Sequence, residues 1–166
     1  ANGFGNLASR ALAMVNKYFD GVVPTPGELT DADKHVVAVA AKAVADADAA
    51  IEEIAIQDAL SAIWTLVDEL NNYITVQEPW ALAKDEANRD RLATVLYVVT
   101  EGLRVLAILL APVIPKATAK LWAALAESSL GKLADQTIAS AGEWGGIKPG
   151  TQLGALEALF PRIEQE

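Results

Sequence analysis

The chain has 166 residues, 52% of them hydrophobic, with no cysteine, one histidine and a formal net charge of −9. This length and hydrophobic content suit one domain with a buried core and argue against disorder, while the lack of cysteine excludes disulfides, thiolate metal sites and a cysteine nucleophile and favours an intracellular setting. A single histidine leaves too few ligands for a zinc site or a histidine-centred triad, and the acidic charge argues against general nucleic-acid binding but leaves room for a small local site.

The first predicted helix covers residues 3–19. Apolar residues recur there at three- and four-residue intervals: Phe4, Leu7, Ala11, Met14, Val15 and Tyr18. A second stripe contains Asn6, Arg10, Ala13 and Lys17. That stripe lies roughly 110° round from the apolar one, on the flank of the helix, so Asn6 and Arg10 are neighbours on an accessible surface. Residues 1–26 carry net +1, whereas residues 27–58 carry −6, so any anion-facing surface should include this first segment.

The second predicted helix follows a proline-containing connection at residues 21–27. Thr30 and Asp33 have the spacing of a capping box at its start. Its predicted buried face runs to about residue 54 and contains Val36, Ala40, Ala43, Val44, Ala47, Ile51 and Ile54. The acids on this alanine-rich helix are interpreted as a solvated face, not a carboxylate site, and His35 as a surface residue.

The third predicted helix, residues 57–75, leads into an elbow. Trp64 lies in its apolar stripe and is predicted to be core, whereas Asn71 falls close to that stripe and needs hydrogen-bond partners. Pro79 cannot continue the helix hydrogen-bond ladder and biases Glu78 away from the helical region. Trp80 is therefore presented at a rigid turn, either as a core plug or as a platform for a planar ligand.

The rest of the sequence, from residue 81 onwards, has the pattern of two more long helices followed by an irregular end. Residues 81–88 are polar and helical in propensity, and residues 89–110 form a fourth helix that becomes apolar all round, as expected at the centre of a bundle. The apolar run 105–115 is shorter than the about 20 residues that span a bilayer. A break at residues 111–115 precedes a fifth helix at 116–125 with Trp122 as core, residues 126–150 lose periodicity, and the apolar tail residues at 152–163 are too few to stand alone. Periodicity thus predicts an all-α, up-and-down bundle of about five helices with an irregular C-terminal tail.

Several motifs together resemble the anticodon-binding domain of methionyl-tRNA synthetases, particularly bacterial ones. The residues that carry the resemblance are Asn6-Leu7-Ala8-Ser9-Arg10, Ala59-Leu60, Ala62-Ile63-Trp64, Asn71, Tyr73-Ile74, Pro79-Trp80-Ala81-Leu82-Ala83-Lys84, Leu103-Arg104, Leu109-Leu110-Ala111-Pro112, Pro115 and the tail from Gly150-Thr151-Gln152-Leu153-Gly154 to Leu159-Phe160-Pro161-Arg162-Ile163-Glu164. The segment from Leu103 to Pro115 is shared across related class I synthetases.

The resemblance implies an RNA site made of Asn6, Arg10 and Trp80, in which Asn6 and Arg10 contact anticodon bases and Trp80 stacks on one of them. Single-stranded bases are read in this way, by stacking on aromatic faces and by hydrogen bonds to their edges. Many relatives carry acidic residues at the positions of Thr75 and Val76, so a base contact made there by a carboxylate is in doubt here. The sequence offers no catalytic residue, no cofactor site and no metal site.

The resemblance also implies that residues 1–166 are one domain of a larger methionine-tRNA ligase that uses ATP and Mg²⁺, whose catalytic nucleotide-binding domain is absent from this chain. We expect a carboxy-terminal portion that cannot activate methionine alone, an interpretation that the missing initiator methionine suits, and tail residues that pack against the missing domain. The expected partners are the tRNA(Met) anticodon loop and that catalytic domain, in a cytoplasmic monomer without membrane contact. Two alternatives stay open: the equivalent domain of another class I synthetase, and a structural or protein-binding bundle.

Overall fold

The computed structural model describes residues 2–156 and 159. The long helices are α1 (Asn2–Phe19), α2 (Asp31–Glu52), α3 (Ile56–Gln77), α5 (Arg89–Leu110) and α6 (Pro115–Leu125). The short elements are α4 (Pro79–Leu82), α7 (Glu127–Leu130), α8 (Ile138–Ala141) and the 3-10 helices η1 (Glu86–Asn88) and η2 (Leu133–Asp135). Within the described residues the fold is therefore all-α, as the periodicity predicts, and its one β-type pairing is an isolated bridge between Val22 and Gln152.

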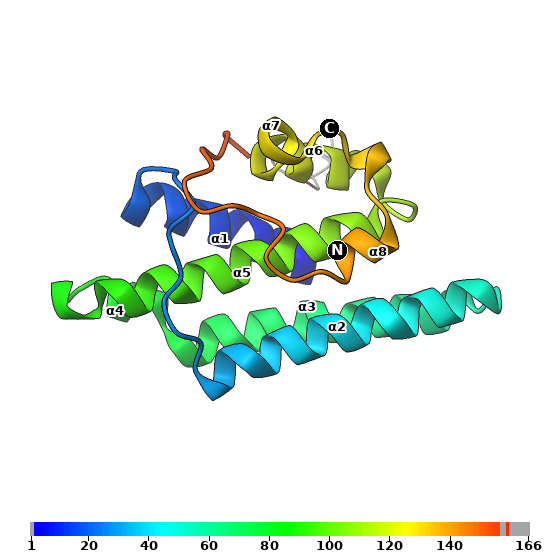
Figure 1. The fold of residues 1–166 in the computed structure, drawn as a ribbon, viewed down its shortest axis with the longest axis horizontal. Coiled ribbons are helices and arrows are strands. Elements are labelled where there is room, and N and C mark those ends of the chain that lie inside the picture. The colour runs from blue at the N-terminus through cyan, green and yellow to red at the C-terminus, as the bar shows by residue number, and fades with distance from the viewer. Residues whose placement is uncertain (1, 157–158, 160–166) are drawn as a thin grey trace, which may run out of the picture.

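Helix α5 is the centre of the bundle. Figure 1 shows it between α1 and α6 on one side and the α2–α3 pair on the other, and every residue from Leu92 to Leu110 is buried. Gly102 allows close contact with α3, because a Cβ there would lie 2.7 Å from Cδ1 of Leu70. Residues 86–110 are long and apolar enough to cross a membrane by length and composition, but the qualifying window is wholly buried inside the bundle. The prediction of a central bundle helix is confirmed.

Helices α2 and α3 form a long antiparallel pair. The predicted capping box is present: the Thr30 side chain accepts from the Asp33 amide, and Asp33 accepts from the Thr30 amide. Placing Ile51 and Ile54 on the buried face was wrong, since they are 43% and 81% exposed. The tip of the pair projects past the end of α5 (Figure 1), so nothing covers these side chains there, and Ile54 has a left-handed backbone with φ 59°.

The tryptophans other than Trp80 lie at different depths. Trp122 is core as predicted, with its Nε1 donating to the Gly131 carbonyl at 2.8 Å. The prediction that Trp64 is core is corrected: it is only partly buried and packs against the core, because the buried positions of α3 around it are taken by Ile63 and Leu66. Trp144 is also partly buried against the core, in the segment after α8.

The described part of the C-terminal segment packs on the bundle itself, which corrects the expectation that its apolar residues pack against a missing domain. Leu153 and Leu159 are buried in the common core, whereas Phe160 and Ile163 lie outside the described residues. The backbone pairs with the α1–α2 connection: the Val23 amide donates to the Thr151 carbonyl at 2.9 Å, and the Leu153 amide donates to the Gly21 carbonyl at 2.7 Å. The tail therefore closes over the end of α1.

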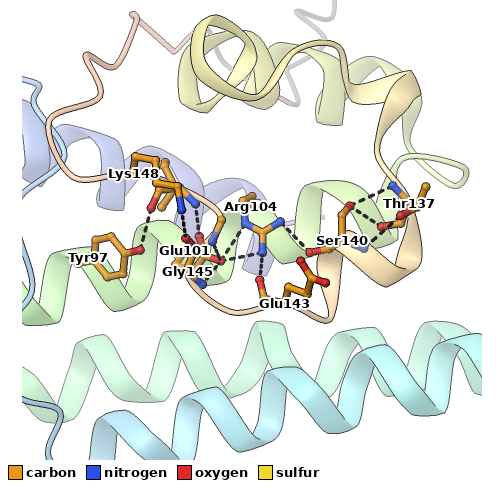
Figure 2. Close-up of polar contacts among 10 residues, drawn as sticks. Tyr97, Glu101, Arg104, Thr137, Ser140, Glu143, Gly145 and Lys148 are labelled. Carbon is orange, nitrogen blue, oxygen red and sulfur yellow. Dashed lines mark hydrogen bonds and ion pairs between the residues drawn. The ribbon is translucent and has the colours of Figure 1, made fainter.

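A buried ion pair on α5 fastens the same segment (Figure 2). The fully buried Glu101 carboxylate accepts from the amides of Gly145, Gly146 and Ile147, each at 2.9 Å. Arg104 bonds Glu101 at 2.8 Å from its Nε and donates to the carbonyls of Ser140 and Glu143. Among the described residues no buried side-chain nitrogen or oxygen lacks a hydrogen-bond partner, so this pair is a satisfied structural anchor.

Candidate nucleic-acid interface

Arg10 and Trp80 meet on one surface although seventy positions separate them. The Cζ atom of Arg10 lies 5.8 Å from the centroid of the Trp80 ring, within the range of a cation–π contact. Both side chains are exposed, Trp80 by 39%. Asn6 is exposed as well, one turn before Arg10 on α1. The first helix and the elbow thus share an accessible surface, with a planar aromatic ring and a fork of guanidinium donors side by side.

The elbow owes its shape to Glu78 and Pro79. Glu78 has the left-handed conformation, φ 48° and ψ 61°, and its amide donates to the Ile74 carbonyl at 3.0 Å, which ends α3. Pro79 then occupies the first position of α4, where its missing N–H costs no hydrogen bond. Pro79 is buried while Trp80, the next residue, faces outward. The Trp80 ring is therefore not a core plug, and part of its surface is open to a ligand.

Asn71 supplies the link between α1 and α3. Its Nδ2 donates to the carbonyl of Gly3 at 3.2 Å and to the carbonyl of Val67 at 3.1 Å. These are the partners that a half-buried amide requires. The bond to Gly3 holds the first turn of α1 against α3, so it sets where the following turns of α1, with Asn6 and Arg10, lie relative to the elbow.

Thr75 and Val76, near the end of α3, offer no carboxylate. Thr75 is exposed, and its hydroxyl donates to the Asn71 carbonyl at 3.1 Å. Val76 is 63% exposed and has no polar side-chain atom. A carboxylate contact to a base from these two positions is therefore not available in this chain.

A charged hydrogen-bond network that the sequence does not predict joins the last turn of α3 to α2 and α5. It consists of Asp33 on α2, Tyr73 and Gln77 on α3, and Arg91 on α5. Burial by itself raises the pKa of Asp33, but hydrogen bonds from Arg91, Tyr73 and the Thr30 amide outweigh it and lower that pKa to about 2. Burial and the bond to Asp33 raise the pKa of Tyr73 well above its usual range. Asp33 is thus a carboxylate in the folded protein, paired with a guanidinium.

The available sequence signal for this network was partial. The sequence predicts Asp33 only as a capping residue, and this prediction is confirmed. Tyr73 and Gln77 are four residues apart and therefore share one side of α3, but nothing in the sequence connects them to Arg91 before the helices pack. Of the four residues, only the role of Asp33 at the helix start followed from local spacing.

Other charged residues of the described segments do not form a metal centre. No group of three or more histidine, aspartate or glutamate side chains is placed to hold an ion. His35 is a surface residue as predicted, with its Nε2 3.7 Å from the Glu69 carboxylate. Two further cation–aromatic pairs lie at the end of α1: Lys17 over Tyr18 at 5.6 Å and Arg89 over Phe19 at 4.4 Å.

A family model described as the anticodon binding domain of methionyl tRNA ligase matches residues 23–166. The chain belongs to this family. A methionine-tRNA ligase of Streptomyces coelicolor is 45% identical to the domain over 170 residues, which cover all of this chain and 32% of that protein. A methionine-tRNA ligase of Caldanaerobacter subterraneus subsp. tengcongensis is 39% identical over 166 residues, which cover all of this chain and 25% of that protein. The chain thus spans about a quarter to a third of the length of these curated relatives.

Solved structures agree with this assignment. The apo form of Mycobacterium tuberculosis methionyl-tRNA synthetase matches the anticodon-binding domain with a TM-score of 0.88 and 37% identity, over 100% of this chain and 33% of that one. The same enzyme bound by methionyl-adenylate matches with a TM-score of 0.87 and 37% identity, over 97% of this chain and 31% of that one. The helical-bundle architecture is therefore that of the family.

Proposed function

We propose that this domain binds the anticodon loop of tRNA(Met) through Asn6, Arg10 and Trp80, and so directs a methionine-tRNA ligase to its tRNA. The observation that supports the proposal most is the exposed contact between Arg10 and Trp80 on two segments that fold together. An unstacked base can lie on the indole face, and stacking of this kind contributes about 1–3 kcal/mol per base. Arg10 and Asn6 offer hydrogen-bond groups beside the ring for base edges or a phosphate.

The electrostatics favour a small, local contact. A protein with a net charge of −9 lacks the broad basic surface of a general nucleic-acid binder. Two of the three proposed contact residues, Asn6 and Arg10, lie on α1, in the first segment of the chain, where the net charge is +1 over residues 1–26. Selectivity then comes from the shape and hydrogen bonding of splayed bases rather than from bulk attraction.

The chemistry of the ligase belongs, in this proposal, to the rest of a longer polypeptide. That part would activate methionine with ATP and Mg²⁺ and join it to the tRNA, in a cytoplasmic monomer. The described residues of this chain offer no metal-binding group, so we assign no chemical step to them. Residues 1–166 act as one domain whose contribution is the choice of tRNA.

The test is binding of anticodon stem-loops at low salt. The chain should bind a loop with the CAU anticodon more tightly than loops altered at the first base. Trp80→Ala should weaken CAU binding roughly tenfold or more, because a stacking platform is lost. Trp80→Phe, which keeps an aromatic face, should retain most of the affinity.

Two controls make the result decisive. Trp144→Ala removes a tryptophan that is packed against another part of the core and should leave binding unchanged. The longer ligase should show the same order of loops with higher affinity. If all loops bind equally well to the wild-type chain, anticodon recognition is wrong and a structural or protein-binding bundle is the better explanation.

A further inference from the structure

We propose that Gln77 and Arg91, anchored by Asp33, are positioning residues for Trp80: they fix the direction in which the elbow presents the indole ring. Arg91 bonds both Gln77 and Asp33 directly, whereas any effect of these residues on RNA binding passes through Trp80. The consequence for RNA binding rests on the proposed function, but the positioning itself does not.

The network holds the last turn of α3 through a hydrogen bond to Gln77, the residue directly before the elbow. One Arg91 nitrogen, Nη2, donates to Oε1 of Gln77 at 2.8 Å and to Oδ1 of Asp33 at 2.9 Å. The other, Nη1, donates to Oδ2 of Asp33 at 2.7 Å. Gln77 is the last residue of α3, so the guanidinium holds the chain three positions before Trp80.

Asp33 holds the Arg91 side chain in a fixed orientation. Its side chain is fully buried and also accepts from the Thr30 amide at 3.0 Å and from the Tyr73 hydroxyl. The carboxylate therefore cannot turn without breaking a helix cap and a buried hydrogen bond. Arg91, bonded to it through both terminal nitrogens, is fixed in a planar fork geometry. The starts of α2 and α5 are thereby tied to the end of α3.

The elbow needs such a clamp because its own backbone is strained. Glu78 is a non-glycine residue in the left-handed region, φ 48° and ψ 61°, which L-amino acids adopt only at a cost. Relaxation of Glu78 towards an ordinary conformation would change the direction of Pro79 and Trp80 relative to α1. The distance of 5.8 Å between Arg10 and the Trp80 ring would then not be kept. Restraint at Gln77 opposes that relaxation.

A purely structural network would instead stabilise the bundle without influence on Trp80. Gln77→Leu separates the two explanations, because it removes the acceptor for Arg91 while the buried Asp33–Arg91 pair remains. Gln136→Leu is the matched control: it makes the same substitution where the side chain bonds the Leu130 and Lys132 carbonyls, next to η2. Asp33 variants are not used in this binding test, since loss of the buried carboxylate would lower the stability of the bundle and so obscure any effect on Trp80.

The first measurement is RNA binding in a double-mutant design. Gln77→Leu should weaken binding of the CAU stem-loop about three- to tenfold, because a misplaced ring loses part of the stacking contribution of about 1–3 kcal/mol per base, and Gln136→Leu should change it less than twofold. In a Trp80→Ala background Gln77→Leu should have no further effect, because the residue through which it acts is gone. An equal loss in both backgrounds would overturn the proposal.

The second measurement needs no RNA. The indole N–H signal of Trp80, assigned by its loss in Trp80→Ala, should shift or broaden in Gln77→Leu, while the Trp122 signal stays in place. An unchanged Trp80 signal would show that Gln77 and Arg91 do not position the ring. If Trp80→Ala itself binds RNA normally, the proposed function fails, and the indole signal still decides the positioning claim.

Discussion

At the residue scale, the proposed site consists of exposed side chains, one of which, Trp80, is of a kind that usually packs in a core. Trp80 follows a buried proline and yet keeps 39% of its surface accessible. Arg10 stands on the flank of α1, as the 110° offset of its stripe indicates, and reaches the ring from there. Exposed aromatic and cationic groups in contact are typical of a recognition surface.

Arg10→Ala should therefore affect binding more than stability. We expect CAU stem-loop affinity to fall roughly tenfold, because a fork of donors is removed from the site. The free energy of unfolding should change by less than about 1 kcal/mol, the scale of an exposed cation–π contact. Binding titrations and urea unfolding of the same samples measure the two quantities. A large drop in melting temperature with intact binding would instead make Arg10 a structural residue.

At the element scale, the ends of α2, α3 and α5 meet in the Asp33 network. Local rules account for part of this: the capping box begins α2, and Pro79 ends the ladder of α3. The bonds from Arg91 to Asp33 and Gln77 join helices that are far apart in the chain. The contribution of these bonds to the free energy of unfolding can be measured as a function of pH.

The Asp33 network should make stability depend on acid. The pKa of Asp33 is about 2 in the folded protein against 3.8 as the reference value. Because the folded-state pKa is the lower one, the stabilisation is fully present above about pH 4 and is lost as pH falls towards 2. The difference is on the order of 2 kcal/mol.

Urea unfolding between pH 2 and pH 5 measures this effect. Asp33→Asn should be less stable than the wild-type chain at pH 5, and the gap should narrow towards pH 2, where the Asp33 carboxylate begins to take up its proton in the folded state as well. Asp46→Asn, at an exposed carboxylate paired with Lys42, is the matched control and should keep the wild-type slope. A constant gap across the range would contradict the assigned protonation state.

At the scale of the whole molecule, the C-terminal segment joins the centre of the bundle to the end of α1. It is anchored on Glu101 and Arg104 of α5 at one point and pairs with the α1–α2 connection at another. This closure holds the C-terminal end of α1, the helix that carries Asn6 and Arg10, against the rest of the bundle. The bond from Asn71 to Gly3 holds the other end of α1. The orientation of the site thus depends on residues distant from it.

Gly146→Ala should disturb this closure. A Cβ at Gly146 would lie 2.5 Å from Cζ of Arg104, whose guanidinium is buried and fully bonded and so cannot move away cheaply. We expect a loss of about 1–3 kcal/mol in the free energy of unfolding, as for overpacked cores. Gly27→Ala, where the nearest atom is 3.6 Å away, is the matched control and should have little effect in the same urea measurement.

The sequence by itself determined the five long helices, the cap of α2 and the elbow, because periodicity, capping and proline chemistry act over a few residues, but it did not predict the short helices between residues 127 and 141. It indicated Asn6, Arg10 and Trp80 through family motifs. Only the tertiary structure decided that Arg10 lies over Trp80, that Ile51 and Ile54 lie on an uncovered tip, and that Leu153 packs on the bundle. These outcomes depend on which helix ends meet and how far each helix extends past its neighbours, and such long-range contacts leave no local pattern in the chain.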